Sequence, residues 1–171
     1  MVKMDLAGVR VDLPTNAPVV LLREQGGMRM LPIFITSDQA TSISHAIQGI
    51  VPPRPLTHDL MRDVLAELGA TLESVVITDI REGTYYAELH LRLAGNTSVV
   101  SSRPSDAIAL AARTGSPIYC EDSLLDAEGV VLSEDDEDTE DDEDDERPED
   151  SDELVGQFRD FIENIRPEDF G

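Results

Sequence analysis

The fold is decided by residues 84–111, which read TYYAELHLRLAGNTSVVSSRPSDAIALA. From Thr84 to Leu93 polar and apolar side chains alternate, which is typical of a strand with one buried face. Gly95-Asn96 predicts a tight turn, and residues 97–101 predict a returning strand. Pro104 then stands in the first turn of a predicted helix with a face of small apolar residues. Two paired strands followed by a helix indicate a mixed α+β fold.

The flanking segments extend this pattern on both sides. Thr36-Ser-Asp-Gln39 has the spacing of a capping box, and it predicts the start of a helix. A second helix is predicted from Thr57 to about Leu68, with Gly69 as its C-terminal cap. Further strands are predicted over 2–12, 19–23, 28–35, 72–80 and 117–120, and one helical turn over 123–127. The prediction is a mixed, largely antiparallel β-sheet packed with about three helices.

The second predicted helix has a strong apolar pattern. Its apolar residues recur at helical spacing, and they predict a face buried against the core. The members of this predicted face are Leu60, Met61, Val64, Leu65 and Leu68.

Charge divides the chain near residue 132. Residues 133–171 carry 20 acidic residues and 3 arginines, whereas residues 1–132 carry 16 acidic and 10 basic residues. We therefore predict a folded domain over 1–132 and an acidic disordered linker over 133–150, because such a run buries too little apolar surface to fold. An amphipathic C-terminal helix is predicted over 151–167 from Leu154, Val155, Phe158, Phe161, Ile162 and Ile165.

Composition excludes several classes of function. The single cysteine, Cys120, rules out an intramolecular disulfide or a cysteine-based zinc site, and it is expected to be a small buried hydrophobe at a strand end. No stretch approaches 18 apolar residues and no signal-peptide pattern is present, so a cytoplasmic protein without a membrane span is expected. No standard ATPase, dehydrogenase, zinc protease or α/β-hydrolase motif is present.

Two segments combine ionisable side chains with rigid prolines at helix starts. The first is Arg54-Pro-Leu-Thr-His-Asp59, and the second opens with Arg103-Pro-Ser-Asp106. Free amide groups and the helix dipole favour anions at such starts, and arginine adds a bidentate phosphate contact. If the two starts converge, they form a pocket suited to a phosphodiester or another anion. The candidates are His58, Asp59 and Asp106 for catalysis, and Arg54, Thr57, Arg103 and Ser105 for substrate binding.

A purely structural interpretation of the same residues stays open. Asp59 and Asp106 stand where acids stabilise helix starts by about 0.3–1 kcal/mol, and each arginine has nearby carboxylates to pair with. His45 and His90 are expected on an interface or a solvated face. A metal-assisted nuclease would use Mg²⁺ or Mn²⁺ held by converging carboxylates. The acids available for this are Asp59, Glu73, Asp79, Glu88 and Asp106.

At these segments the chain resembles the bifunctional nuclease family, also catalogued as domain of unknown function 151. The resemblance rests on residues 54–60, Leu68-Gly69, residues 103–113 and Pro117-Ile118, and it spans about residues 2–132 in element order. It implies a mixed α+β domain, a dimer, and nuclease activity towards DNA and RNA. It carries over to the motif positions Arg54, Thr57, His58, Asp59, Arg103, Ser105 and Asp106. One departure is Ser101-Ser102, where the family often has an acid.

Two functions remain open at this point. The first is a phosphodiester hydrolase in which His58 or Asp59 activates water, directly or through a divalent ion, while Arg54 and Arg103 stabilise the charge on phosphorus. The second is a non-enzymatic module that binds an anion in the same pocket. Alternatively, such a module would bind a protein partner through the acidic tail or the C-terminal helix.

Overall fold

The computed structural model describes residues 1–131. The disordered linker predicted over 133–150 and the helix predicted over 151–167 therefore lie outside the described residues. No helix within residues 1–131 combines the length and the apolar character that crossing a membrane would require.

The described chain is built on one mixed β-sheet of eight strands in the order β6-β5-β4-β7-β1-β2-β3-β8. Within it, β4 and β7 pair in parallel, and the other neighbouring strands pair antiparallel. The fold class predicted from the sequence is confirmed. The strands are β1 (Val2–Asp12), β2 (Ala17–Glu24), β3 (Arg29–Phe34), β4 (Ala70–Arg81), β5 (Thr84–Leu93), β6 (Asn96–Ser102), β7 (Ile118–Cys120) and β8 (Val130–Val131).

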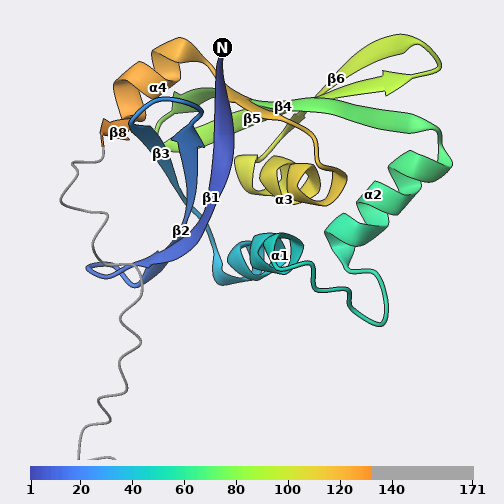
Figure 1. The fold of residues 1–171 in the computed structure, drawn as a ribbon, viewed down its shortest axis with the longest axis horizontal. Coiled ribbons are helices and arrows are strands. Elements are labelled where there is room, and N and C mark those ends of the chain that lie inside the picture. The colour runs from blue at the N-terminus through green and yellow to red at the C-terminus, as the bar shows by residue number, and fades with distance from the viewer. Residues whose placement is uncertain (132–171) are drawn as a thin grey trace, which may run out of the picture. The chain divides into compact units, whose positions relative to one another are not determined.

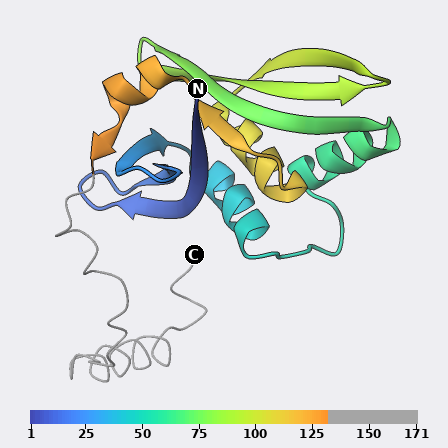
Figure 2. The same ribbon diagram turned by 45° about the horizontal axis from the view of Figure 1, so that its top comes forward.

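Three helices lie together on one side of the sheet, and a short fourth helix lies near β3 (Figures 1 and 2). In this layer α3 lies between α1 and α2 and contacts both. The helices are α1 (Ser37–Ile47), α2 (Thr57–Glu67), α3 (Pro104–Thr114) and α4 (Asp122–Glu128). The sequence indicated about three helices and a single turn near Ser123, and that turn is the longer helix α4.

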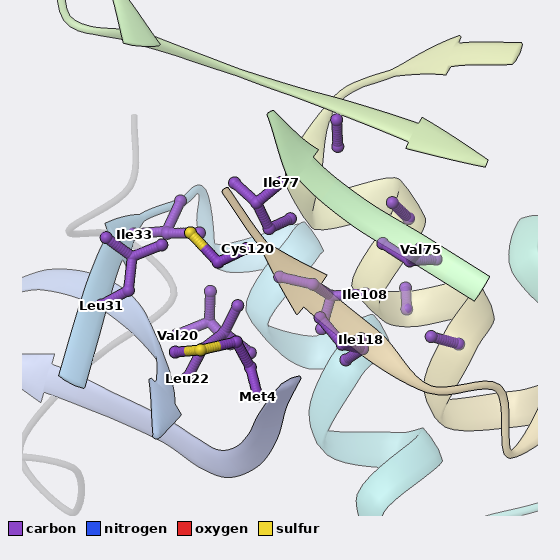
Figure 3. Packing of buried hydrophobic residues seen from close by; sticks show 14 of the residues in the cluster. Met4, Val20, Leu22, Leu31, Ile33, Val75, Ile77, Ile108, Ile118 and Cys120 are labelled. Carbon is purple, nitrogen blue, oxygen red and sulfur yellow. The ribbon is translucent and has the colours of Figure 1, made fainter. Parts of the chain in front are cut away.

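The core fills the space between the sheet and helices α1 and α3. Ile43 of α1 and Ile108 and Leu110 of α3 are fully buried against residues of both halves of the sheet. Figure 3 shows Cys120 at the end of β7 among Ile33 and Ile77. Its complete burial confirms the expectation of a small core residue at a strand end.

The buried face predicted for α2 is wrong. Leu60, Met61, Val64 and Leu68 are between 38% and 65% exposed, whereas Leu65 packs against the core. The reason is geometric, because α2 contacts α3 and β4 along only one side of its surface. We call Leu60, Met61, Val64 and Leu68 the apolar stripe of α2.

The sheet edge formed by β6 is also exposed. Its six residues from Asn96 to Ser101 are all solvent-exposed, including Val99 and Val100, and the strand contains no charged residue and no proline. Edge strands of this kind lack the usual protection against pairing with another strand.

Candidate functional site

Three helices meet around the ring of His58. Its Nδ1 lies 2.8 Å from Oγ of Ser42 on α1, and its Nε2 lies 3.2 Å from Oδ1 of Asp106 on α3. Arg103, just before α3, donates from Nε to Oδ2 of Asp106 at 2.7 Å and from Nη2 to Oδ1 at 2.9 Å. We call Ser42, His58, Arg103 and Asp106 the helix-junction cluster.

Local structure explains why these side chains project where they do. Pro104 opens α3 because its fixed backbone angle suits the first helical position, and Asp106 follows two residues later in the first turn. His58 occupies the first turn of α2. The Pro-rich connector after α1 brings that turn back to face α1 and α3. Two helix starts are thereby placed side by side, and both favour negative charge.

The charge state of Asp106 is set by opposing effects. Partial burial acts to raise the pKa of its carboxyl, but hydrogen bonds from Arg103 and His58 outweigh burial, so the pKa lies below its ordinary value. Asp106 is therefore ionised at neutral pH and only accepts hydrogen bonds. The side chain of Arg103 is 68% exposed and engages Asp106 through Nε and Nη2. No hydrogen bond within residues 1–131 occupies its Nη1, which is therefore its open edge.

Asp59 has the same position in α2 that Asp106 has in α3, but its partners differ. Its Oδ1 accepts a 2.6 Å hydrogen bond from Nε of Arg113, and its Oδ2 accepts a 3.0 Å bond from the amide of Leu56. Arg113 also donates to the carbonyl of Ala109. The Arg113 hydrogen bond holds the pKa of Asp59 below its usual range, although burial opposes it. This carboxylate therefore caps α2 and fixes it to α3.

The structure places the remaining candidates apart from these contacts. Arg54 is exposed in the connector and makes no ion pair within residues 1–131. Thr57 is exposed at the first position of α2, where the predicted helix also begins, and Leu56 is the residue that precedes the helix. Ser105 is buried, with 5% of its surface exposed, in the packing of α3.

Two residues of this region escaped the sequence analysis, and each left a signal in the sequence. Ser42 directly precedes Ile43 on α1, and a hydroxyl on the flank of a buried stripe can face a neighbouring helix. Arg113 stands in the last turn of a helix whose face of small apolar residues is buried. A charged residue in such a helix requires a partner, because an unpaired buried charge is very costly. The partner, however, comes from 54 positions earlier in the chain.

A divalent ion would need several carboxylates that converge on one position. Within residues 1–131 no group of three or more His, Cys, Asp or Glu side chains converges in a way that would hold an ion. Mg²⁺ prefers oxygen ligands in octahedral geometry. The helix-junction cluster offers one carboxylate, and Arg103 and His58 already engage both of its oxygens. This arrangement does not fit Mg²⁺ or Mn²⁺.

A pocket of about 360 Å³ lies on the Asp59 side of α2. Its walls come from the end of α1, the connector, the first turn of α2 and the end of α3, and they include both Asp59 and Arg113. His45 also lines this pocket, and its Nδ1 is buried without a hydrogen-bond partner within the described residues. Most of the other lining residues are apolar, among them Ile50, Val51, Pro52 and Pro55.

Comparison with known proteins shows related sequences. The chain is 43% identical over 170 residues to the uncharacterized protein Rv1829 of Mycobacterium tuberculosis, covering 99% of this chain and 98% of that protein. It is 31% identical over 113 residues to bifunctional nuclease 1 of Oryza sativa subsp. indica, and 30% identical over 125 residues to bifunctional nuclease 2 of Arabidopsis thaliana. These matches cover 64% and 70% of this chain but only 34% and 38% of the plant proteins.

The sequence model of the bifunctional nuclease domain family matches residues 20–133. This range includes all four residues of the helix-junction cluster. This range begins within β2 and extends past β8, so it covers most of the sheet and every described helix. The chain therefore belongs to the bifunctional nuclease domain family.

Proposed function

We propose that this protein hydrolyses phosphodiester bonds of DNA or RNA at the helix-junction cluster. The observation that carries the proposal is the contact of His58 with an ionised Asp106 that Arg103 also binds. Histidine is the side chain most often used for proton transfer, and arginine stabilises the charge that develops on phosphorus. Family membership supports the same chemistry.

The proposed roles follow from the geometry. His58 is held by hydrogen bonds at both ring nitrogens, so its orientation is set before any substrate arrives. Arg103 presents its open edge to solvent, where it can bind a non-bridging phosphate oxygen. Arg54, exposed and without an acidic partner within residues 1–131, is proposed as a second phosphate contact, and Thr57 lies close to it in the chain.

The structure supports different roles for Asp59 and Ser105. Asp59 is occupied by Arg113, so we propose that it supports the position of α2 and does not transfer protons. Ser105 is proposed to act through the packing of α3. Because the carboxylates of residues 1–131 do not fit Mg²⁺ or Mn²⁺, no step here depends on either ion, and the assay below tests whether cleavage requires one. We propose the cytoplasm as the location of the activity.

The test is cleavage of fluorescent single-stranded and duplex DNA and RNA by the purified full chain, with Mg²⁺, with Mn²⁺ and with a chelator. His58→Ala and Asp106→Asn should each lower the rate by about 10²–10⁴, because both impair proton transfer. His90→Ala is the matched control, since His90 lies at the same 3.2 Å from Glu88 on β5. If His58→Ala cuts as well as the His90→Ala control, any cleavage observed does not belong to this site.

A second candidate function is a binding module, and the apolar stripe of α2 is the observation in its favour. We propose that a second copy of this chain covers the stripe, which agrees with the dimer implied by the family resemblance. The exposed β6 edge is a separate surface for the same association, because two such uncharged edges can pair with each other. A protein partner bound through the stripe, the acidic tail or the C-terminal segment is the other outcome of the tests below.

A further inference from the structure

The proposed hydrolysis needs a nucleophile, and the contacts of His58 restrict what it can be. Both ring nitrogens are already engaged, Nδ1 by Ser42 and Nε2 by Asp106. A water molecule would have to displace one of these partners before His58 could take its proton. Ser42 needs no displacement, because its hydroxyl already lies at hydrogen-bonding distance.

The direction of these two hydrogen bonds follows from the state of Asp106. Its ionised carboxylate only accepts, so Nε2 of His58 carries a hydrogen and donates it. When the ring is neutral, Nδ1 then has a free lone pair, and the Ser42 hydroxyl, 2.8 Å away, is placed to donate to it. The cluster thus forms a directed chain from Ser42 through His58 to Asp106.

We propose that Ser42 is the nucleophile of this site and forms a covalent phosphoserine intermediate. This inference rests on the proposed function and adds the identity of the attacking group. The chain of contacts follows the logic of a serine–histidine–aspartate triad, in which a base held by a carboxylate activates a hydroxyl. In that template Nε2 of the histidine contacts the serine and Nδ1 contacts the aspartate. Here Nδ1 contacts Ser42 and Nε2 contacts Asp106.

The neighbouring hydroxyl on α1 shows that the contact of Ser42 is specific. Thr41 bonds back to the carbonyl of Ser37 at 2.8 Å, as hydroxyls within helices often do. Ser42 faces α2 and bonds His58 across 16 positions of sequence. Ser42 is also only partly buried.

Each step of the proposed reaction balances. Oγ of Ser42 attacks phosphorus as its proton moves to Nδ1 of His58, and the imidazolium is stabilised by Asp106. The bond from phosphorus to the departing oxygen breaks, and that oxygen takes the proton from His58. Water then attacks the phosphoserine and gives a proton to His58, the bond to Oγ breaks, and Ser42 regains its proton. One water is consumed, and nothing is oxidised or reduced.

The charged residues around Ser42 suit these reaction steps. Arg103 shares Asp106 with His58 and presents its open edge at the same helix start, where negative charge accumulates on phosphorus. The hydrogen bond to Asp106 is the main cause that raises the pKa of Arg103, and Asp38, in the first turn of α1, adds a smaller contribution. Arg103 therefore stays charged throughout the reaction.

The experiment uses the full chain and the chromogenic diester thymidine 5′-(p-nitrophenyl phosphate). A good leaving group makes the first step fast, so hydrolysis of phosphoserine becomes limiting and a burst of about one nitrophenolate per site is expected. Acid quenching during the steady state, followed by peptide mass spectrometry, should find the nucleotide adduct on Ser42. Ser42→Ala should lose at least about a hundredfold in rate, whereas Ser44→Ala, on the same helix but without a bond to the cluster, should match the parent.

Three results would overturn the inference. The first is that Ser42→Ala keeps its rate within about threefold while His58→Asn loses it, which would make water the nucleophile and leave the proposed function intact. The second is a loss of rate in Ser42→Ala with neither burst nor adduct in the parent, which is what a residue that only positions His58 would give. The third is a parent that cleaves no substrate, which removes the proposed function as well.

Discussion

Nε of Arg113 lies 2.6 Å from Oδ1 of Asp59, and the two side chains are only 4% and 12% exposed. This pair joins the first turn of α2 to the last turn of α3. Most of the other ion pairs in residues 1–131 lie at the surface, where such pairs contribute little. Together with the contacts of His58 to Ser42 and Asp106, the Asp59–Arg113 pair holds α2 in position, and it is the most buried of the ion pairs described.

Replacing Arg113 should destabilise the protein strongly. Arg113→Met leaves the charge of Asp59 buried and unpaired, and we expect a loss of about 3–5 kcal/mol in the free energy of unfolding. Arg62→Met is the control, because its pair with Asp63 is exposed and should cost less than about 1 kcal/mol. Urea unfolding followed by circular dichroism measures both. Equal losses in the two variants would contradict the structural role assigned to this pair.

The contribution of the same pair should disappear in acid. The hydrogen bond from Arg113 lowers the pKa of Asp59 in the folded state, so the Asp59 carboxylate binds a proton more readily in the unfolded chain. The stabilisation is complete above the unfolded value of about 3.9 and is lost as the pH falls towards the folded pKa. The comparison is with the Asp59→Leu/Arg113→Met double variant, which lacks the pair. As the pH falls from about 5 to about 2.5, the free energy of unfolding of the parent should therefore decrease relative to that of the variant. A constant difference over that range would count against the assignment.

Cys120 should be inert while the protein is folded. Burial is the main cause that raises the pKa of its thiol to about 12, so almost no reactive thiolate exists at pH 8. Iodoacetamide should label the native protein at least about a hundredfold more slowly than the protein in denaturant. Because Cys120 is the only cysteine, the labelled fraction reports directly on the folded core. Rapid labelling of the native protein would show that the end of β7 opens readily.

Removing residues 133–171 should increase nucleic-acid cleavage at low salt. The truncation removes 20 acidic residues and 3 arginines, so the net charge changes from −23 to −6 and repulsion of a polyanion falls. We expect a lower KM for the truncated protein, and the difference should shrink above about 0.3 M salt, where the Debye length is below about 6 Å. The control substrate is the small diester, whose single charge should make KM nearly independent of the tail. A lower KM that persists at high salt would instead indicate a specific contact of the tail.

Val64→Asp should convert the proposed dimer into a monomer. Val64 lies at the centre of the apolar stripe, and two buried aspartates facing each other across a twofold axis would repel. The molar mass from light scattering after size exclusion should halve compared with the parent. Val11→Asp, on the exposed part of β1, is the control and should leave the mass unchanged. A parent that is already monomeric would favour a protein partner on the stripe.

The sequence predicted the sheet better than the surroundings of the helices. The alternation in residues 84–93 is a local property, and it correctly placed Ala87 and Leu89 on the buried face of β5. The apolar stripe of α2 has an equally clear pattern, but helical periodicity shows only that a face is apolar, not what covers it. The two residues of β8 were missed because so short a strand is defined by pairing with β3 and not by its own composition.

The difference between local sequence patterns and tertiary packing also explains which residues of the candidate site could be predicted. His58, Arg103 and Asp106 belong to motifs at helix starts, so their residue types and spacing marked them out. Ser42 and Arg113 are ordinary residues within their helices, and only tertiary packing gives them partners 16 and 54 positions away. The roles of Asp59 and Asp106 also could not be separated by sequence, because both occupy the same position in their helices.

The shallow packing of α2 has a consequence for how the protein loses function on heating. The helix that carries His58 buries one side only, so it has the least apolar surface holding it in place among α1, α2 and α3. Segments with few buried contacts open at a lower free energy than the molecule as a whole. Detachment of α2 would separate His58 from Ser42 and Asp106 while the sheet stayed intact. Inactivation should therefore precede melting, and the cluster would act as an early indicator of damage in an otherwise folded protein.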